Sequence, residues 1–108
     1  MGDETPSARM TYGNYLRLDE LLSLQSGPMG HNPSPSNHEM HFIITHQSFE
    51  LWFKQIIREL DQALGLMNQD LVDEKSIPII VQHLERCSEI FRLLASRWKV
   101  MELSLIHI

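Results

Sequence analysis

SNHEMHFIITHQSFELWFKQIIRELDQALGLM, residues Ser36–Met67, carries the strongest helical pattern in the chain. Its apolar residues alternate in steps of three and four, which is the spacing of one helix face, at Phe42, Phe49, Phe53, Ile56, Leu60, Ala63 and Met67. Ser36 and Glu39 have the spacing of a capping box, in which each side chain bonds a backbone N–H of the first turn. We therefore predict a long amphipathic helix that begins near Asn37.

A second amphipathic stretch follows a polar connection at residues 68–78. Its apolar positions are Ile77, Ile80, Val81, Leu84, Cys87, Phe91, Leu94, Trp98 and Met101. Ser76 is placed to cap this helix, and Pro78 is tolerated in a first turn. Because each stripe requires an apolar partner, the two long helices are expected to form an antiparallel hairpin.

The N-terminal part predicts a shorter helix. Leucines at helical spacing indicate a helix over about Leu18–Gln25, and Tyr12 and Tyr15 precede it on a bend at Gly13–Asn14. Residues 26–35 are rich in proline, glycine and serine and predict a loop. The predicted fold is all-α, an antiparallel pair of long helices plus a short N-terminal helix, with residues 1–10 disordered.

The amino-acid composition limits the classes of function that we expect for the chain. The chain has 108 residues, a net charge of -5 and a pI near 5.6, so we expect one modest domain and no nucleic-acid partner. It contains no apolar run of membrane-spanning length, and its start lacks the pattern of a signal peptide, so we expect a cytoplasmic protein without membrane contact. Cys87, the single cysteine, is predicted to be a small buried hydrophobic residue.

His46 is the candidate functional residue, because it replaces an apolar residue in the stripe between Phe42 and Phe49. Apolar neighbours disfavour the charged imidazole, and the neutral ring offers one N–H donor and one bare nitrogen acceptor. That chemistry suits a hydrogen bond to an N–H group of an aromatic substrate. The alternative is a core histidine with satisfied hydrogen bonds. A metal site would require His31, His38 and His41 to converge, and we favour solvated histidines there.

Two blocks resemble the tryptophan 2,3-dioxygenase family, YGNYLRLDELL at Tyr12–Leu22 and FIITHQSFELWFKQIIREL at Phe42–Leu60. The resemblance covers about residues 11–102 and implies part of a larger helical haem-dioxygenase domain. It implies a homotetramer in which ferrous haem (heme iron) binds O2 and both oxygen atoms enter the indole ring of L-tryptophan. The product would be N-formylkynurenine, the first step of tryptophan catabolism by the kynurenine pathway.

The resemblance also assigns roles to residues. The family histidine matching His46 hydrogen-bonds the indole nitrogen, and the phenylalanine matching Phe42 packs against the substrate ring. Tyrosines matching Tyr12 and Tyr15 help to enclose the active site. The iron and O2 perform the difficult step, while these side chains orient the substrate and exclude water.

The chain departs from the family pattern in several places. His38 stands where the family has an acidic residue, and His41 where it has an apolar one. The proximal haem histidine and the arginine that binds the substrate carboxylate are absent, and neither His83 nor His107 lies in the proximal motif. Residues 103–108, LSLIHI, resemble translated adapter DNA and are expected to be a non-native tail.

We therefore expect an N-terminal fragment that is inactive alone and that is marginally stable or self-associates. The alternatives are a short paralogue with a divergent tail and a non-enzymatic helical interaction module in which His46 is a core residue.

Overall fold

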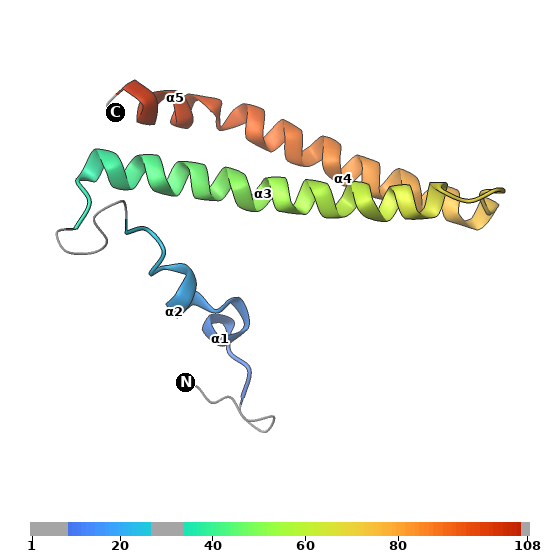
Figure 1. Ribbon diagram of the computed structural model, residues 1–108, viewed down its shortest axis with the longest axis horizontal. Coiled ribbons are helices and arrows are strands. Elements are labelled where there is room, and N and C mark those ends of the chain that lie inside the picture. The colour runs from blue at the N-terminus through green and yellow to red at the C-terminus, as the bar shows by residue number, and fades with distance from the viewer. Residues whose placement is uncertain (1–8, 27–33, 107–108) are drawn as a thin grey trace. The chain divides into compact units, whose positions relative to one another are not determined.

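The computed structural model describes the backbone of residues 9–26 and 34–106, with side chains up to Leu103 (Figure 1). Helices are the regular elements of these ranges, and no strand occurs in them, which confirms the all-α class. The chain divides into two units, Met1–Pro35 and Ser36–Ile108, and each unit is described separately. The described residues do not include residues 1–8 of the expected disordered start, most of the predicted loop, His31 or His107.

The first unit contains two short helices, α1 (Tyr12–Leu16) and α2 (Leu18–Leu21). Thr11 begins α1, because its Oγ1 accepts a hydrogen bond from the Asn14 backbone N–H at 3.1 Å. Arg17 separates the helices in the left-handed conformation, with φ 54° and ψ 49°. This backbone is unfavourable for a residue with a Cβ, and two hydrogen bonds from the guanidinium to the Glu20 carboxylate accompany it.

Two N-terminal predictions were therefore wrong. Tyr12 and Tyr15 lie within α1 instead of on a bend before a helix, and the helix after them ends at Leu21 rather than at Gln25. The physical reason for the first error is the Thr11 cap, which starts the first helix earlier in the chain than the apolar spacing indicated.

The second unit is built on α3 (Asn37–Met67), an uninterrupted helix of 31 residues. Ser36 is its N-cap, and the Ser36 Oγ accepts from the Glu39 backbone N–H at 3.1 Å. The predicted start and the Ser36 half of the predicted capping box are confirmed.

After the connection come a 3-10 turn, η1 (Glu74–Ser76), and the helices α4 (Ile77–Ser96) and α5 (Trp98–Ile106). Ser76 makes no side-chain capping bond to α4; instead the Asp73 carboxylate caps η1 by accepting from the Lys75 N–H at 3.0 Å. The predicted continuous helix to Met101 is broken at Arg97, whose N–H bonds both the Leu93 and the Leu94 carbonyl oxygens. Such a shared bond closes a helix end.

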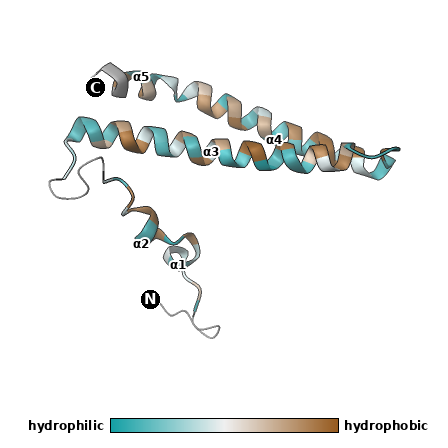
Figure 2. Cartoon of the chain, viewed as in Figure 1, coloured by the Kyte–Doolittle hydropathy of each residue, from teal (hydrophilic) through white to brown (hydrophobic). Residues whose placement is uncertain are grey.

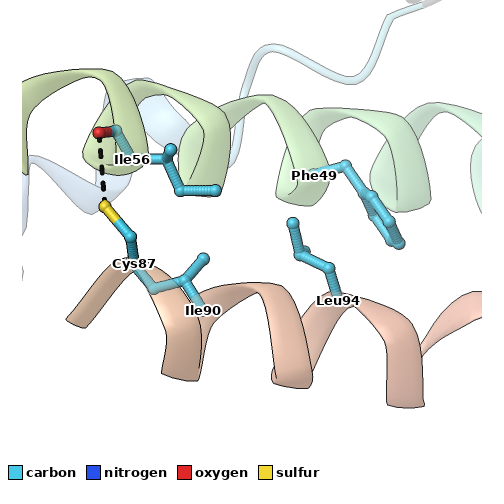
Figure 3. Packing of buried hydrophobic residues seen from close by; sticks show 5 residues of the cluster. All are labelled: Phe49, Ile56, Cys87, Ile90 and Leu94. Atoms are coloured by element: carbon cyan, nitrogen blue, oxygen red, sulfur yellow. Dashed lines mark hydrogen bonds between the residues drawn. The ribbon is translucent and has the colours of Figure 1, made fainter. Parts of the chain in front are cut away.

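The helices α3 and α4 lie side by side and run in opposite directions (Figure 1), as predicted. Their shared core is shown in Figure 3 and consists of Phe49, Ile56, Cys87, Ile90 and Leu94, each between 5% and 8% exposed. Met101 of α5 packs against this cluster. Removing these side chains from water is the main stabilising contribution to the hairpin.

The buried side of α3 is turned relative to the predicted stripe. Phe49, Ile56 and Ala63 are buried as predicted, but Phe53, Leu60 and Met67 are 39–48% exposed. Thr45 and Glu59 are buried in their place, at 6% and 3% exposure. The reason is that α3 carries apolar residues around a wide arc, visible as brown segments along its length in Figure 2, and α4 covers only one side of it.

The helix α4 shows the same shift. Ile80, Cys87 and Leu94 are buried as predicted, and Ile90 was missed. Five predicted core residues are at least 45% exposed, namely Ile77, Val81, Leu84 and Phe91 of α4 and Trp98 at the start of α5. Each helix thus keeps an apolar side that its partner does not cover, as the expectation of leftover apolar surface required. Among the described helices, none is both long enough and apolar enough to traverse a lipid bilayer.

The burial of Cys87 predicts an unreactive thiol. Burial, and secondarily the negative charge of Glu59, raise the pKa of Cys87, and its Sγ lies 3.8 Å from the Ile56 carbonyl oxygen. Because the thiolate is the reactive form, we expect a disulfide reagent to modify Cys87 slowly in the folded chain and rapidly in denaturant. The control is Cys87→Ala/Ser88→Cys, which moves the thiol to an exposed neighbouring position. Equal rates for the two proteins would contradict the burial of Cys87.

Candidate functional site

Phe42 and His46 form one local unit near the start of α3. They stand four residues apart, so their side chains lie on the same side of the helix. Their ring centroids are 4.1 Å apart with an angle of 35° between the planes, and both residues are half-buried. The structure therefore brings together the two predicted site residues of the central helix.

A backbone hydrogen bond determines which tautomer a neutral His46 ring adopts. Nδ1 lies 2.9 Å from the carbonyl oxygen of Phe42, and a carbonyl oxygen can only accept. Nδ1 must therefore carry a proton, and in the neutral imidazole Nε2 is then the bare acceptor. The same bond restricts rotation of the ring. A neutral His46 could therefore accept a hydrogen bond at Nε2, and its contact with a substrate stays a prediction.

Neighbouring hydroxyl groups are held by the helix itself. Thr45 Oγ1 donates to the His41 carbonyl oxygen at 2.7 Å, and Ser48 Oγ donates to the Thr45 carbonyl oxygen at 2.8 Å. Both side chains line a mainly apolar hollow of about 280 Å³ that α3 shares with α4 and α5. His46 is not among the residues that line this hollow, so the Phe42–His46 pair is a separate feature of α3.

Tyr12 and Tyr15 are placed in the other unit. They lie in α1 and are 76% and 73% exposed. Their predicted contribution to the same site as His46 stays a prediction.

The remaining described histidines have other surroundings. His38 and His41 are exposed in the first turns of α3, and His83 Nδ1 lies 2.6 Å from Glu59 Oε1. Within residues 9–26 and 34–106, no three histidine, cysteine, aspartate or glutamate side chains gather as a metal-binding group. His31, the third residue of the hypothetical metal site, lies outside these ranges.

Sequence reasoning missed the buried carboxylate of Glu59. The signal was available, because Glu59 follows Phe49 and Ile56 in the same alternation of four and three that leads to Ala63. A carboxylate at such a position requires donors from the facing helix, and His83 and Arg86 provide them.

Comparison with known proteins identifies a family and individual proteins that are similar to this chain. The sequence model of the tryptophan 2,3-dioxygenase family matches residues 2–105. A tryptophan 2,3-dioxygenase of Dictyostelium discoideum is 42% identical over 91 residues, which are 84% of this chain and 23% of the relative. Tryptophan 2,3-dioxygenase 2 of Ralstonia nicotianae is 41% identical over 93 residues, 86% of this chain and 25% of the relative.

The chain therefore spans about a quarter of the length of these curated relatives. No solved structure matches it significantly. The family match extends over nearly the whole sequence and includes both helices of the hairpin and the Phe42–His46 pair. This chain belongs to the tryptophan 2,3-dioxygenase family.

Proposed function

We propose that this chain forms part of a haem-dependent dioxygenase that opens the indole ring of L-tryptophan with O2 and yields N-formylkynurenine. The observation that supports this is the 2.9 Å bond between His46 Nδ1 and the Phe42 carbonyl oxygen, because in the neutral imidazole it leaves Nε2 as the acceptor. The indole N–H is a donor without acceptor capacity, so it is complementary to a bare imidazole nitrogen.

The division of labour follows from these side chains. His46 would accept the indole N–H and so fix the orientation of the ring, and the Phe42 ring beside it would contact the aromatic face of the substrate. Tyr12 and Tyr15 would help to exclude water, as the family resemblance implies. We further propose a cytoplasmic homotetramer for the complete enzyme.

The described residues fit one side of a haem pocket. They offer an aromatic ring and an imidazole on α3 whose Nε2 can accept when the ring is neutral, and an exposed apolar side that continues along the helix through Phe53, Ile57 and Leu60. Haem iron, when bound, supplies the activation of O2. We assign no iron ligand in this chain, because neither His83 nor His107 lies in the proximal motif of the family. The axial histidine and the carboxylate-binding arginine are expected in another part of the enzyme.

The test compares ring cleavage by enzyme variants. The chain is expressed with its natural C-terminal extension, loaded with haem, and assayed for N-formylkynurenine with His46→Ala, and with His41→Ala as the exposed histidine control. Loss of one hydrogen bond predicts a kcat/KM about tenfold lower for His46→Ala and little change for His41→Ala. The 108-residue form is expected to be inactive.

A methylated substrate isolates the hydrogen bond. N1-methyl-tryptophan lacks the indole N–H, so on this substrate His46→Ala should lose much less activity relative to the unsubstituted enzyme than it does on tryptophan. Equal losses on both substrates would show that His46 acts in another way. Haem binding without ring cleavage would leave the family assignment standing and contradict the proposed reaction.

The second candidate is a non-enzymatic helical interaction module. It is favoured by the uncovered apolar side of α3, where Ile57 and Leu64 are each 59% exposed. Failure of the extended protein to bind haem, together with binding of an amphipathic helix that Leu64→Lys abolishes, would support this function over the enzymatic one.

A further inference from the structure

Glu59 is a carboxylate buried between α3 and α4. Its side chain is 4% exposed, whereas the α4 side chains that approach it, His83 and Arg86, are 19% and 59% exposed. Glu59 Oε1 lies 2.6 Å from His83 Nδ1, and Oε2 lies 2.7 Å from Gln55 Nε2 and 3.4 Å from Arg86 Nη1. The carboxylate is therefore bonded to its own helix and to the facing one.

The groups around the carboxylate favour its ionised form. Gln55 Nε2 and Arg86 Nη1 are donors, and Nδ1 of His83 donates whenever it carries a proton. From α4, the buried Cys87 also lies close enough for the charge of Glu59 to raise its pKa. Glu85 and Glu89 line the adjoining surface groove together with Glu59 and Arg86. The two acidic neighbours make the donors at His83 and Arg86 still more important for holding an ionised Glu59.

We propose that Glu59 and His83 form an acid-sensitive clamp, in which the ionised Glu59 carboxylate holds α4 against α3 and its protonation releases the hairpin. A protonated Glu59 would keep one oxygen as an acceptor, but its O–H would be directed at one of the groups around it, and the Gln55 Nε2 and Arg86 Nη1 atoms that face it are donors. At least one charge-assisted hydrogen bond of the buried carboxylate would then be lost, which is costly in a protein interior. This inference does not depend on the proposed enzymatic function.

The direction of the pH effect follows from linkage. The hydrogen bond from His83 is the main cause that lowers the pKa of Glu59 below 4.5; burial opposes it, and the bonds from Gln55 and Arg86 lower the pKa further. A carboxyl group whose pKa is lower in the folded chain stabilises the fold above its unfolded pKa. That stabilisation is lost as the pH falls below 4.5 through the folded value.

The experiment follows urea unfolding of the 108-residue chain by circular dichroism, from neutral pH to well below 4.5. It compares the chain with Glu59→Gln, with the apolar pair Glu59→Met/His83→Met, and with Glu50→Gln, an exposed glutamate of the same helix. At neutral pH, Glu59→Gln should raise the unfolding equilibrium constant roughly tenfold or more, because an amide cannot accept from all three donors. Glu50→Gln should match the unsubstituted chain at every pH.

The stabilities measured at acidic pH give the decisive comparison between the variants. The unsubstituted chain and Glu50→Gln should lose stability steeply in acid, whereas Glu59→Met/His83→Met should fold with a clearly shallower pH dependence, since apolar pairs can replace buried ion pairs. If Glu59→Gln does not fold at all, the double methionine variant alone provides the comparison. The same acid dependence with and without the pair would overturn the clamp. So would the absence of cooperative unfolding at neutral pH, because nothing would then hold the helices together.

Discussion

Replacing Phe49 by alanine is expected to lower the free energy of unfolding of the hairpin by ~3–5 kcal/mol. Phe49 is 7% exposed in the core with Ile56 and Leu94, so truncation both removes apolar contact and leaves a cavity. Because small domains are stable by only about 5–15 kcal/mol, this loss is a large part of the total. The measurement is the urea midpoint of helical circular dichroism.

The matched control for this prediction is Phe53→Ala. Phe53 lies one turn along α3 and is 39% exposed, and its ring meets that of Phe49 edge to face at 6.2 Å between centroids. Such a ring pair contributes about 0.5–1.5 kcal/mol and is lost in either variant, so it does not bias the comparison. We expect Phe53→Ala to cost less than half as much as Phe49→Ala. Equal losses would mean that α4 packs on the side of α3 that the apolar spacing predicted.

Replacing Ile56 by aspartate is expected to prevent stable folding, with a loss of about 4–5 kcal/mol or more. Ile56 is 6% exposed, and its neighbours in the core are apolar. A carboxylate placed there would lose its hydration and would also lie one helical turn from the ionised Glu59, so burial and like charge oppose it together.

Ile57→Asp is the control, since it makes the same chemical change at the next residue. Ile57 is 59% exposed, so its aspartate would remain in water. The two substitutions impose the same loss of helix propensity, which cancels in the comparison. Measured helix content at neutral pH should fall sharply for Ile56→Asp and little for Ile57→Asp. A reversed order would show that the core lies on the other side of the helix.

The sequence predicted those features that depend on local interactions. The start of α3 follows from the hydroxyl of Ser36, and the pairing of Phe42 with His46 follows from their spacing of four. The hairpin followed from two amphipathic stripes joined by a polar connection. Each of these features is determined by residues within a few positions of one another, or by a simple requirement for an apolar partner.

Features that depend on the facing helix could not be predicted in the same way. Both long helices have apolar residues on two sides, so spacing alone did not show that Ile90 would be buried and Phe91 exposed. The end of α1 was missed for a different reason. A left-handed conformation at Arg17 is unfavourable by itself, and only the observed bonds to Glu20 show how the chain accommodates it.

The buried Glu59 also affects which alignment of the two helices is possible. The α3 core positions Phe49, Ile56 and Ala63 repeat every seven residues, as do Ile80, Cys87 and Leu94 of α4. A slip of one heptad would therefore again place apolar side chains opposite one another. It would also place Ile90 or Ser76, instead of His83, opposite Glu59. The carboxylate therefore favours the alignment that provides it with the His83 donor.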